Sequence, residues 1–543
     1  MSSHIEVCLG HWQRALGSDF VRTQPEALRQ AETATYRTEH HIPAVLLPAS
    51  RSQVQQCLRI ANHYGVPVYP ISSGKNWGYG SRVPASDGCV LLDLSRLDRI
   101  LDFNEDLGYV TVEPGVTQKQ LYQFLTERNS GLWMDATGSS PNCSLIGNAM
   151  ERGFGHTPMA DHFAHVCGLE VVLPDGEILE TGSAGLEGCL TAAVNRWGLG
   201  PSLDGLFSQS NLGVITRMTI WLMPRPDAFE AFFFRASNAQ SLPALVNALR
   251  ELRLKEILRS AIHIGNDYKV LAGLRQYPWQ EMQGRTPISP EGIAEFRKRL
   301  GFGHWNISGG LYGTPAQVSE TKRILRKAFT KHSGTLQFLS PKKLALARKF
   351  AKPFRLISGW DLSKTVDLVE PVLGLMQGVP TEQPLKSAYW RKRSQPGPDM
   401  DPDRDRCGLL WYAPVTPATG SAVQRLTDLA STTLLRFGFE PMISLTFLTP
   451  RLISCVVSIS YDRDIPGQDE QAAACHDELV DCCSRAGYYP YRLGIRSMNQ
   501  ISQSEGYRKV LRRIKNALDP EGVLAPGRYD QSAALINREA VLT

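Results

Sequence analysis

A glycine-rich loop that directly follows a predicted strand constrains this chain more than any other feature of its sequence. Apolar residues at 66–71 predict a buried strand, and the loop after it, residues 72–82, reads SSGKNWGYGSR. Glycines let a backbone approach a ligand closely, and successive N–H groups beside Lys75 suit a phosphate. The loop is not a Walker A loop, since Asn76 replaces the Ser or Thr that follows Gly-Lys, and it is not a GxGxxG fingerprint. An ordinary glycine-rich turn is the alternative.

Apolar periodicity divides the chain into regions with different patterns. In residues 1–225, short strands and helices are predicted to alternate, with strands at 43–48, 66–71, 89–94, 109–112, 169–173, 177–181 and 214–222 and helices at 53–64 and 117–125. Residues 174–176, Pro-Asp-Gly, predict a hairpin turn between the strands at 169–173 and 177–181. Residues 226–490 contain longer helices between strands, for example helices at 315–331 and 421–437 and a strand at 455–459. A helix at 503–518 and a Pro/Gly-rich turn at 519–529 follow. Pro224 and Pro226 mark the boundary between two predicted domains.

Composition and charge exclude several classes of function. A net charge of +6 over 543 residues is far from the concentrated basic surface that nucleic-acid binding needs. No apolar run approaches the ~20 residues that span a bilayer, and no secretory signal is visible, so no membrane partner is predicted. Eleven cysteines without a CxxC pair predict free thiols and a cytoplasmic protein. The basic residues 342–355 predict a solvated amphipathic helix, with membrane or anion contact as the alternative.

Two further stretches of small residues lie in the first 225 residues. Residues 139–155 read SSPNCSLIGNAMERGFG, and residues 205–224, GLFSQSNLGVITRMTIWLMP, lead into the last predicted strand of that region. Each stretch is a weak signal by itself. Three such loops at strand ends in one domain, however, suit an extended dinucleotide.

These three stretches, together with DPEGVLAPGR at 519–528, resemble motifs of the vanillyl-alcohol oxidase and 4-cresol dehydrogenase (para-cresol methylhydroxylase) family of 4-phenol oxidases, in the same order. The resemblance covers essentially the full chain and is strongest over 44–225 and 485–530. It implies an α+β, two-domain flavoprotein, with a PCMH-type FAD-binding domain at 1–225, an α+β cap domain that binds substrate at 226–490, and a C-terminal segment at 491–543 that completes the FAD site. The FAD contacts that it implies are Pro70, Ser72, Ser73, Gly74, Lys75, Asn76, Trp77, Gly78, Tyr79, Gly80, Ser81, Ser144, Gly147, Asn148, Gly153, Val214, Ile215 and Arg528.

The same resemblance implies the substrate. The family binds a phenol as its phenolate through two tyrosines and an arginine, which match Tyr79, Tyr491 and Arg492. The physical chemistry fits, because a guanidinium beside two hydroxyl donors favours the anion of a phenol whose pKa is near ~10. Hydride can then leave the benzylic carbon for the flavin, which gives a quinone methide. Without the resemblance, Tyr491 and Arg492 could equally be a surface pair at the end of a strand.

The chain departs from the family at several positions. Leu409 stands where many members attach FAD covalently, and Asn76 stands where related flavoproteins attach it through a histidine, so noncovalent FAD is predicted; the missing tether implies a weaker oxidant or a substrate that is easier to oxidise. Ser139 replaces an aspartate near the flavin, and His156 replaces the tyrosine of a GYTP motif. We expect His156 to be either a base or a structural hydrogen-bonding residue. The family's cap histidines are missing around 453–454.

These departures favour a larger or amino-acid-derived 4-hydroxyphenyl compound over a simple cresol. We expect an FAD-dependent oxidase or dehydrogenase that forms a homodimer and can pass electrons to an acceptor protein. The alternatives are an FAD enzyme that acts on a non-phenolic alcohol or amine, and a homologue that binds ligands without catalysis. His156, His162 and His165 match no zinc pattern, so no metal site is predicted.

Overall fold

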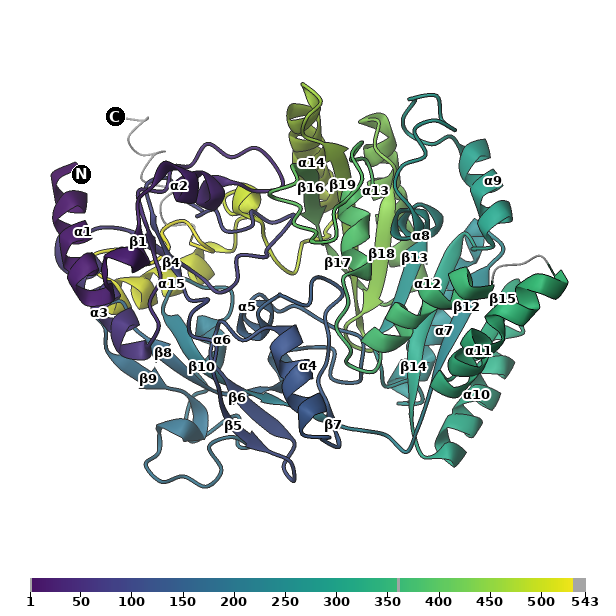
Figure 1. Cartoon of the computed structure of the whole chain (residues 1–543), viewed down its shortest axis with the longest axis horizontal. Coiled ribbons are helices and arrows are strands. Elements are labelled where there is room, and N and C mark those ends of the chain that lie inside the picture. Colours follow the sequence, from purple (N-terminus) through teal and green to yellow (C-terminus); the bar gives the residue numbers. More distant parts are fainter. Residues whose placement is uncertain (1, 359–361, 531–543) are drawn as a thin grey trace.

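The computed structural model describes residues 2–358 and 362–530, which form two units side by side (Figure 1). The helices of the N-terminal unit are α1 (Ser2–Leu16), α2 (Pro25–Glu32), α3 (Arg51–Tyr64), α4 (Gln118–Glu127), α5 (Leu145–Met150) and α6 (Asp204–Phe207). Its strands are β1 (Val21–Arg22), β2 (Val45–Leu46), β3 (Val68–Ile71), β4 (Val90–Asp93), β5 (Ile100–Asn104), β6 (Tyr109–Val112), β7 (Leu132–Trp133), β8 (Val166–Val172), β9 (Ile178–Glu180), β10 (Val214–Trp221) and β11 (Met223–Pro224).

Two sheets build the N-terminal unit. The first has the strand order β1-β2-β4-β3, in which β2, β4 and β3 are parallel and α3 connects β2 to β3. The second has the order β5-β6-β10-β8-β9 and is antiparallel throughout. The predicted alternation of strands and helices over residues 1–225 is therefore correct for β2, α3, β3 and β4. It is wrong for most of the second sheet, where most neighbouring strands lack a connecting helix, but the predicted hairpin is confirmed by the antiparallel pair β8 and β9. Antiparallel strands can be joined by short turns, so no helix is needed there.

The second unit contains an eight-stranded sheet with the order β15-β12-β14-β13-β18-β19-β16 and β17 paired to β19. Its strands are β12 (Ala228–Ala236), β13 (Ile262–Asn266), β14 (Trp305–Gly313), β15 (Gly334–Leu339), β16 (Cys407–Tyr412), β17 (Val415–Pro417), β18 (Met442–Phe447) and β19 (Leu452–Asp462). Its helices are α7 (Leu242–Leu254), α8 (Asp267–Leu274), α9 (Pro290–Leu300), α10 (Pro315–Phe329), α11 (Pro341–Ser358), α12 (Leu362–Leu375), α13 (Gly420–Arg436) and α14 (Gln468–Arg485). The change from one sheet to the other falls between β11 and β12.

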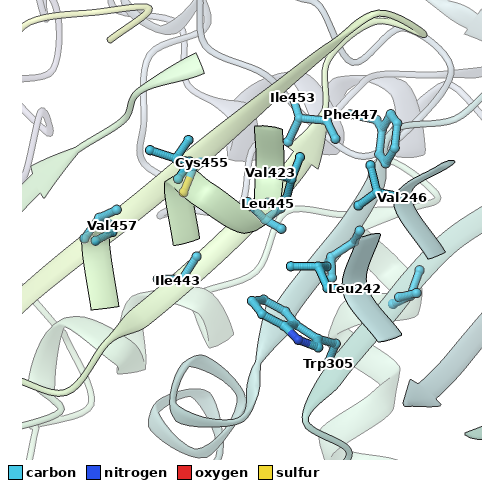
Figure 2. Close-up of a cluster of buried hydrophobic side chains, with 14 of the residues drawn as sticks. Leu242, Val246, Trp305, Val423, Ile443, Leu445, Phe447, Ile453, Cys455 and Val457 are labelled. Carbon is cyan, nitrogen blue, oxygen red and sulfur yellow. The ribbon is translucent and has the colours of Figure 1, made fainter. Parts of the chain in front are cut away.

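The two faces of this sheet carry different residues, because side chains alternate along a strand. One face packs on α7, α13 and α14 in the largest buried cluster of the described chain, to which β13 contributes Ile262 and Ile264. The same cluster contains Ile443, Leu445 and Phe447 of β18 and Ile453, Cys455 and Val457 of β19 (Figure 2). The residues between them, such as His263, Ser444 and Thr446, lie on the opposite face and line a cavity. The helices thus fix which strand positions face a ligand.

The C-terminal segment returns to the N-terminal unit. Helix α15 (Glu505–Leu518), drawn in yellow in Figure 1, packs Ile514 and Leu518 against the core of the antiparallel sheet. Leu524 then forms a β-bridge with Val68 of β3. Lys515 anchors the turn between them, since its ammonium group donates to the carbonyl of Leu524. The last residues of the predicted segment 491–543 lie outside the described residues.

Sequence periodicity located most of the elements that it predicted to within about two residues, for example α10, α13, β6 and β10. The N-terminal helix α1, whose Trp12 is buried, was not predicted from the sequence. Residues 342–355 belong to α11, and the side chains of 350–355 lie outside the described ones; Arg348 pairs with Asp367 of α12. No described helix is long and apolar enough to cross a membrane. All eleven cysteines are free.

Candidate active site

A cavity of about 1160 Å³ lies between the N-terminal unit and the open face of the large sheet. All predicted site residues except Gly78 and Gly80 line it. From the N-terminal unit these are Pro70, Ser72, Ser73, Gly74, Lys75, Asn76, Trp77, Tyr79, Ser81, Ser139, Ser144, Gly147, Asn148, Gly153, His156, Val214 and Ile215. Tyr491, Arg492 and Arg528 of the C-terminal segment and Leu409 of β16 complete the set. The three small-residue loops therefore converge on one cavity.

Gly78 and Gly80 hold the glycine-rich loop against its neighbours instead of facing the cavity. Gly78 has φ +76°, and a Cβ placed on it would lie 2.9 Å from the Trp411 ring; Gly80 has φ +119°, and its Cβ would lie 2.7 Å from Ile495. Any larger residue would force the loop off Trp411. The backbone N–H of Trp411 donates to the carbonyl of Gly78 at 3.0 Å, which ties the loop to β16 of the second unit.

Two aspartates of the second unit, Asp401 and Asp403, bind side chains of the same loop. Asp403 accepts hydrogen bonds from the Ser81 hydroxyl at 2.6 Å and from the Trp77 indole at 3.1 Å, and burial raises the pKa of Asp403 to about 7. Lys75, the residue considered for a phosphate, forms an ion pair with Asp401 at 2.9 Å. The loop is thus held by the second unit as well as by its own glycines.

The second loop leaves space only for small residues. A Cβ on Gly147 would lie 2.3 Å from the Ser72 hydroxyl oxygen, and a Cβ on Gly153 would lie 2.2 Å from the Asn148 side chain. The Ser73 hydroxyl accepts a hydrogen bond from the backbone N–H of Ser144 at 3.2 Å, which joins this loop to the first. Together they form a cradle of backbone along one wall of the cavity.

Tyr79, Tyr491 and Arg492 come together at one end of the cavity. The Arg492 guanidinium lies 4.0 Å from the centre of the Tyr79 ring, and its Nη2 donates to Asn76 Oδ1 at 2.6 Å. Burial, with repulsion from Tyr491, raises the pKa of Tyr79 well above its usual value, although Arg492 opposes the shift. Burial likewise raises the pKa of Tyr491, again against Arg492. Both hydroxyls are therefore neutral at pH 7 and can donate hydrogen bonds to an anion.

Glu151 is a shared partner that sequence reasoning missed. It lies 3.3 Å from Arg492 Nη2, pairs with Arg528, and accepts a hydrogen bond from the Tyr529 hydroxyl at 3.0 Å. The cluster of Arg492, Arg528 and Glu151 therefore carries a net charge of +1, with Arg492 as its member beside Tyr79. Glu151 was visible within the second small-residue stretch, but no spacing in the sequence connects it to partners at the C-terminal end of the chain.

Two stacked histidines lie elsewhere on the cavity wall. The rings of His156 and His263 are 4.2 Å apart, and burial lowers the pKa of His156 below its usual value and that of His263 well below it. His156 Nδ1 lies 3.0 Å from the Ala136 carbonyl, so Nδ1 carries the proton of the neutral ring and Nε2 keeps its lone pair. His263, on β13, was not predicted, although it lies two strands from Ser454, near which the sequence lacks the expected cap histidines.

The remaining predicted positions are placed as follows. Ser139 lines the cavity and accepts a hydrogen bond from the Cys143 thiol at 3.4 Å. Leu409 is held on β16 by two hydrogen bonds with Thr35, each of 2.8 Å. His162 lies 2.5 Å from the Asn148 side chain and His165 lies 2.8 Å from the Asp161 carbonyl. Within the described residues, no three side chains of the His, Cys, Asp or Glu type gather to hold a metal ion.

Comparisons with known proteins agree with this geometry. Residues 42–182 match the family described as FAD binding domain. The 1'-carboxy-chondrochloren decarboxylase of Chondromyces crocatus is 45% identical over 529 residues, 97% of each chain. The 4-cresol dehydrogenase [hydroxylating] flavoprotein subunit of Pseudomonas putida is 32% identical over 520 residues, 94% of this chain and 93% of the relative. Solved p-cresol methylhydroxylase with substrate bound superposes with a TM-score of 0.87 at 30% identity, covering 97% of each chain.

The fold and the cavity together define a flavoprotein with a PCMH-type FAD-binding domain and an α+β cap domain, which confirms the predicted fold class. The residues present fit FAD, since the backbone cradle at Gly147 and Gly153 leaves room for a ligand and no larger side chain. The chain belongs to the vanillyl-alcohol oxidase and 4-cresol dehydrogenase family and is an FAD-dependent oxidoreductase.

Proposed function

We propose that the protein oxidises the benzylic carbon of a para-substituted phenol that is bound as its phenolate. The observation that carries this proposal is the cluster of Tyr79, Tyr491 and Arg492 at one end of the cavity. Two neutral hydroxyl donors and a permanently charged guanidinium are suited to an aromatic oxyanion. An uncharged alcohol or an amine would leave the net charge of +1 on the cluster of Arg492, Arg528 and Glu151 without a counter-ion.

The chain's own residues prepare the substrate for oxidation. Arg492 lowers the pKa of the bound phenol, and the resulting phenolate pushes electron density to the para carbon. FAD, when bound, accepts the hydride that leaves the benzylic carbon. The substrate is then a quinone methide, and water that adds to its benzylic carbon while a proton leaves restores the ring to its phenolate form. The free Nε2 of His156 is the group we assign to receive that proton, with Ser139 on the same wall.

A second outcome is favoured by the 45% identity to a decarboxylase. In a substrate with a carboxylate on the carbon next to the benzylic one, the quinone methide can lose CO₂ instead of gaining water. The two electrons of the broken C–C bond form a C=C bond and return the ring to phenolate, so no further oxidant is needed. This outcome requires water to be kept from the benzylic carbon, and Phe154 and Trp411 supply apolar surface on the cavity wall.

We also propose how FAD is attached, which kind of partner the protein has, its oligomeric state and its location. Leucine cannot form a bond to flavin, so Leu409 supports dissociable FAD. The name of the P. putida relative describes a subunit, which supports an acceptor protein as partner. The homodimer and the cytoplasmic location are proposals that gel filtration and cell fractionation test.

Anaerobic reduction of the flavin by a panel of para-substituted compounds tests the proposed function. We expect 4-alkylphenols and 3-(4-hydroxyphenyl)propanoate to bleach the flavin, and their O-methyl ethers, whose ring oxygen cannot ionise, to leave it yellow. Styrene-type products and CO₂ from the propanoate would identify the decarboxylating outcome. If the ethers, simple benzyl alcohols or amines bleach the flavin as fast as the phenols do, the phenolate proposal is wrong. A protein that holds FAD yet ignores every compound would instead favour the catalytically inactive homologue.

A further inference from the structure

Lys269 lies on the wall of the cavity at the start of α8. Its stem packs over the end of β13, since a Cβ on Gly265 would lie 3.8 Å from Lys269 Cγ. Its ammonium group donates to the Ser387 hydroxyl at 3.2 Å, and both residues line the cavity. Sequence reasoning gave this lysine no role, because nothing in the residues around it forms a motif.

Lys269 differs from the other inward-facing lysines in having no carboxylate partner. Lys392 pairs with Asp462 at 2.9 Å, Lys515 with Asp519 at 2.5 Å, and Lys75, on the same cavity wall, with Asp401 at 2.9 Å. Across residues 2–358 and 362–530, no Asp or Glu lies within ion-pair distance of the Lys269 ammonium. A charge taken out of water without a partner is costly, so an anion that enters the cavity gains this amine as its counter-ion.

Burial alone lowers the pKa of Lys269 to about 8, and no charged neighbour contributes to the shift. The amine is therefore mostly protonated at pH 7, and an anion beside it raises its pKa again. A single ammonium group with one hydroxyl balances a monoanion such as a carboxylate. The second negative charge of a dianionic phosphate would not be balanced by this single ammonium group.

Lys269 and the phenolate cluster face different parts of the same cavity. Tyr79 packs edge-on to Trp411 of β16, with ring centres 5.7 Å apart, whereas Lys269 follows β13. Strand β13 is three steps from β16 in the sheet order, and each step is about 4.8 Å, so the two strands are roughly 14 Å apart. Long side chains reach inward from both sides, which leaves space between them for an aromatic ring and a short chain.

We propose that Lys269, with Ser387, binds a carboxylate at the end of the substrate opposite its phenol group, so that the substrate class is a 4-hydroxyphenyl carboxylic acid. The inference rests on the proposed function for the position of the phenol. Lys269 is a specificity residue in this proposal and takes no part in hydride transfer. The carboxylate could be retained in the product, or lost as CO₂ where the second outcome applies.

The test compares two ligands that differ in the carboxylate, namely 3-(4-hydroxyphenyl)propanoate and 4-propylphenol, on the FAD-loaded protein. Lys269→Met removes the charge at similar length, and Lys269→Arg keeps it. Lys386→Met is the matched control, because Lys386 lies in the same 3₁₀ turn as Ser387 (Gln383–Tyr389) but is exposed and does not line the cavity. Binding is measured from the change in flavin absorbance, and reduction is measured anaerobically.

In Lys269→Met we expect the Kd of the propanoate to rise roughly 10- to 100-fold, as expected for one charge-assisted hydrogen bond. The Kd of 4-propylphenol should stay within about twofold, Lys269→Arg should recover part of the loss, and Lys386→Met should change neither ligand. Equal weakening of both ligands, or an unchanged Kd for the propanoate, would overturn the proposal. If neither ligand reduces the flavin but the propanoate binds in a Lys269-dependent way, the proposed function fails while the carboxylate site stands.

Discussion

Replacing Arg492 by alanine tests most directly whether the site lowers the pKa of a bound phenol. Arg492 is nearly buried, lies 4.0 Å from the Tyr79 ring centre and is held by Asn76 and Glu151. Two opposite unit charges about 4 Å apart attract by about 4 kcal/mol at an effective dielectric constant of about 20. That energy corresponds to about three pKa units of the bound phenol. The Glu151 carboxylate is present in both proteins, so its repulsion of the phenolate largely cancels.

Water that enters the vacated space will reduce this effect, so we expect the pKa of the bound phenol to rise by about one to three units. Because only the phenolate transfers hydride, the rate of anaerobic flavin reduction rises with pH through that pKa and then levels off. Arg492→Ala should therefore reduce flavin roughly 10- to 1000-fold more slowly at pH 7. It should regain much of the lost rate as the pH approaches ~10, the pKa of a free phenol.

The assay is stopped-flow reduction with one 4-alkylphenol across a range of pH, repeated with ring-fluorinated analogues whose phenol is more acidic. The fluorinated substrates should rescue the variant at lower pH, which a merely misfolded site would not allow. Arg496→Ala is the control, since Arg496 pairs with Asp477 at the surface and should leave the profile unchanged. A variant that is uniformly slower at every pH and insensitive to fluorination would refute the assignment of Arg492 to phenolate binding.

Three other outcomes are expected. Acid precipitation should release all of the flavin into the supernatant, because Leu409 offers no atom for a covalent bond; yellow precipitate would show attachment elsewhere. Gly78→Ala should cost about 1–3 kcal/mol of stability more than Gly88→Ala, measured as thermal unfolding of the holoprotein, because both glycines have positive φ but only Gly78 meets a neighbouring ring. The depressed pKa values of His156 and His263 make their contribution to stability complete above about pH 6.5, and it should be lost at lower pH by up to about 2.7 kcal/mol per unit. Thermal unfolding from pH 7.5 to 5.5 checks the sign, and a double His→Asn variant that keeps the full slope would contradict the explanation.

The sequence predicted those parts of the site that are built from local signals. A glycine-rich loop after a strand and two more small-residue loops are short-range patterns, so the amino-acid order alone was enough to predict that these three loops bind one extended ligand. Their individual contacts, such as Tyr79, Ser144 and Gly147, came from the family resemblance. Tyr491 and Arg492 needed the family resemblance, because an adjacent Tyr-Arg pair has no local signature. The spacing of elements in the second domain was likewise readable from its helical periodicity.

The parts that were not predicted depend on contacts between distant segments. His263 belongs to the open face of a sheet whose other face is covered by helices, and alternation along one strand cannot say which face that is. Lys269 follows in α8, and no local pattern shows that its side chain reaches the same cavity. The role of Glu151 depends on its ion pairs with Arg492 and Arg528, which belong to the C-terminal segment. Apart from the hairpin of β8 and β9, the antiparallel pairing of the second sheet was not predicted, because the sequence of a single strand does not show which other strand it pairs with.

In the large sheet of the cap domain, residues that stabilise the fold alternate along one strand with residues that line the cavity. The odd-numbered residues of β18, such as Ile443 and Leu445, pack in the hydrophobic core, while the even-numbered residues Ser444 and Thr446 line the cavity. A substitution at an even-numbered position therefore leaves the hydrophobic core unchanged, so the side chains that contact a substrate can change while the fold is kept. Relatives with one framework and different substrates are the natural result of such an arrangement, and engineering of new substrate ranges should begin with these alternate residues.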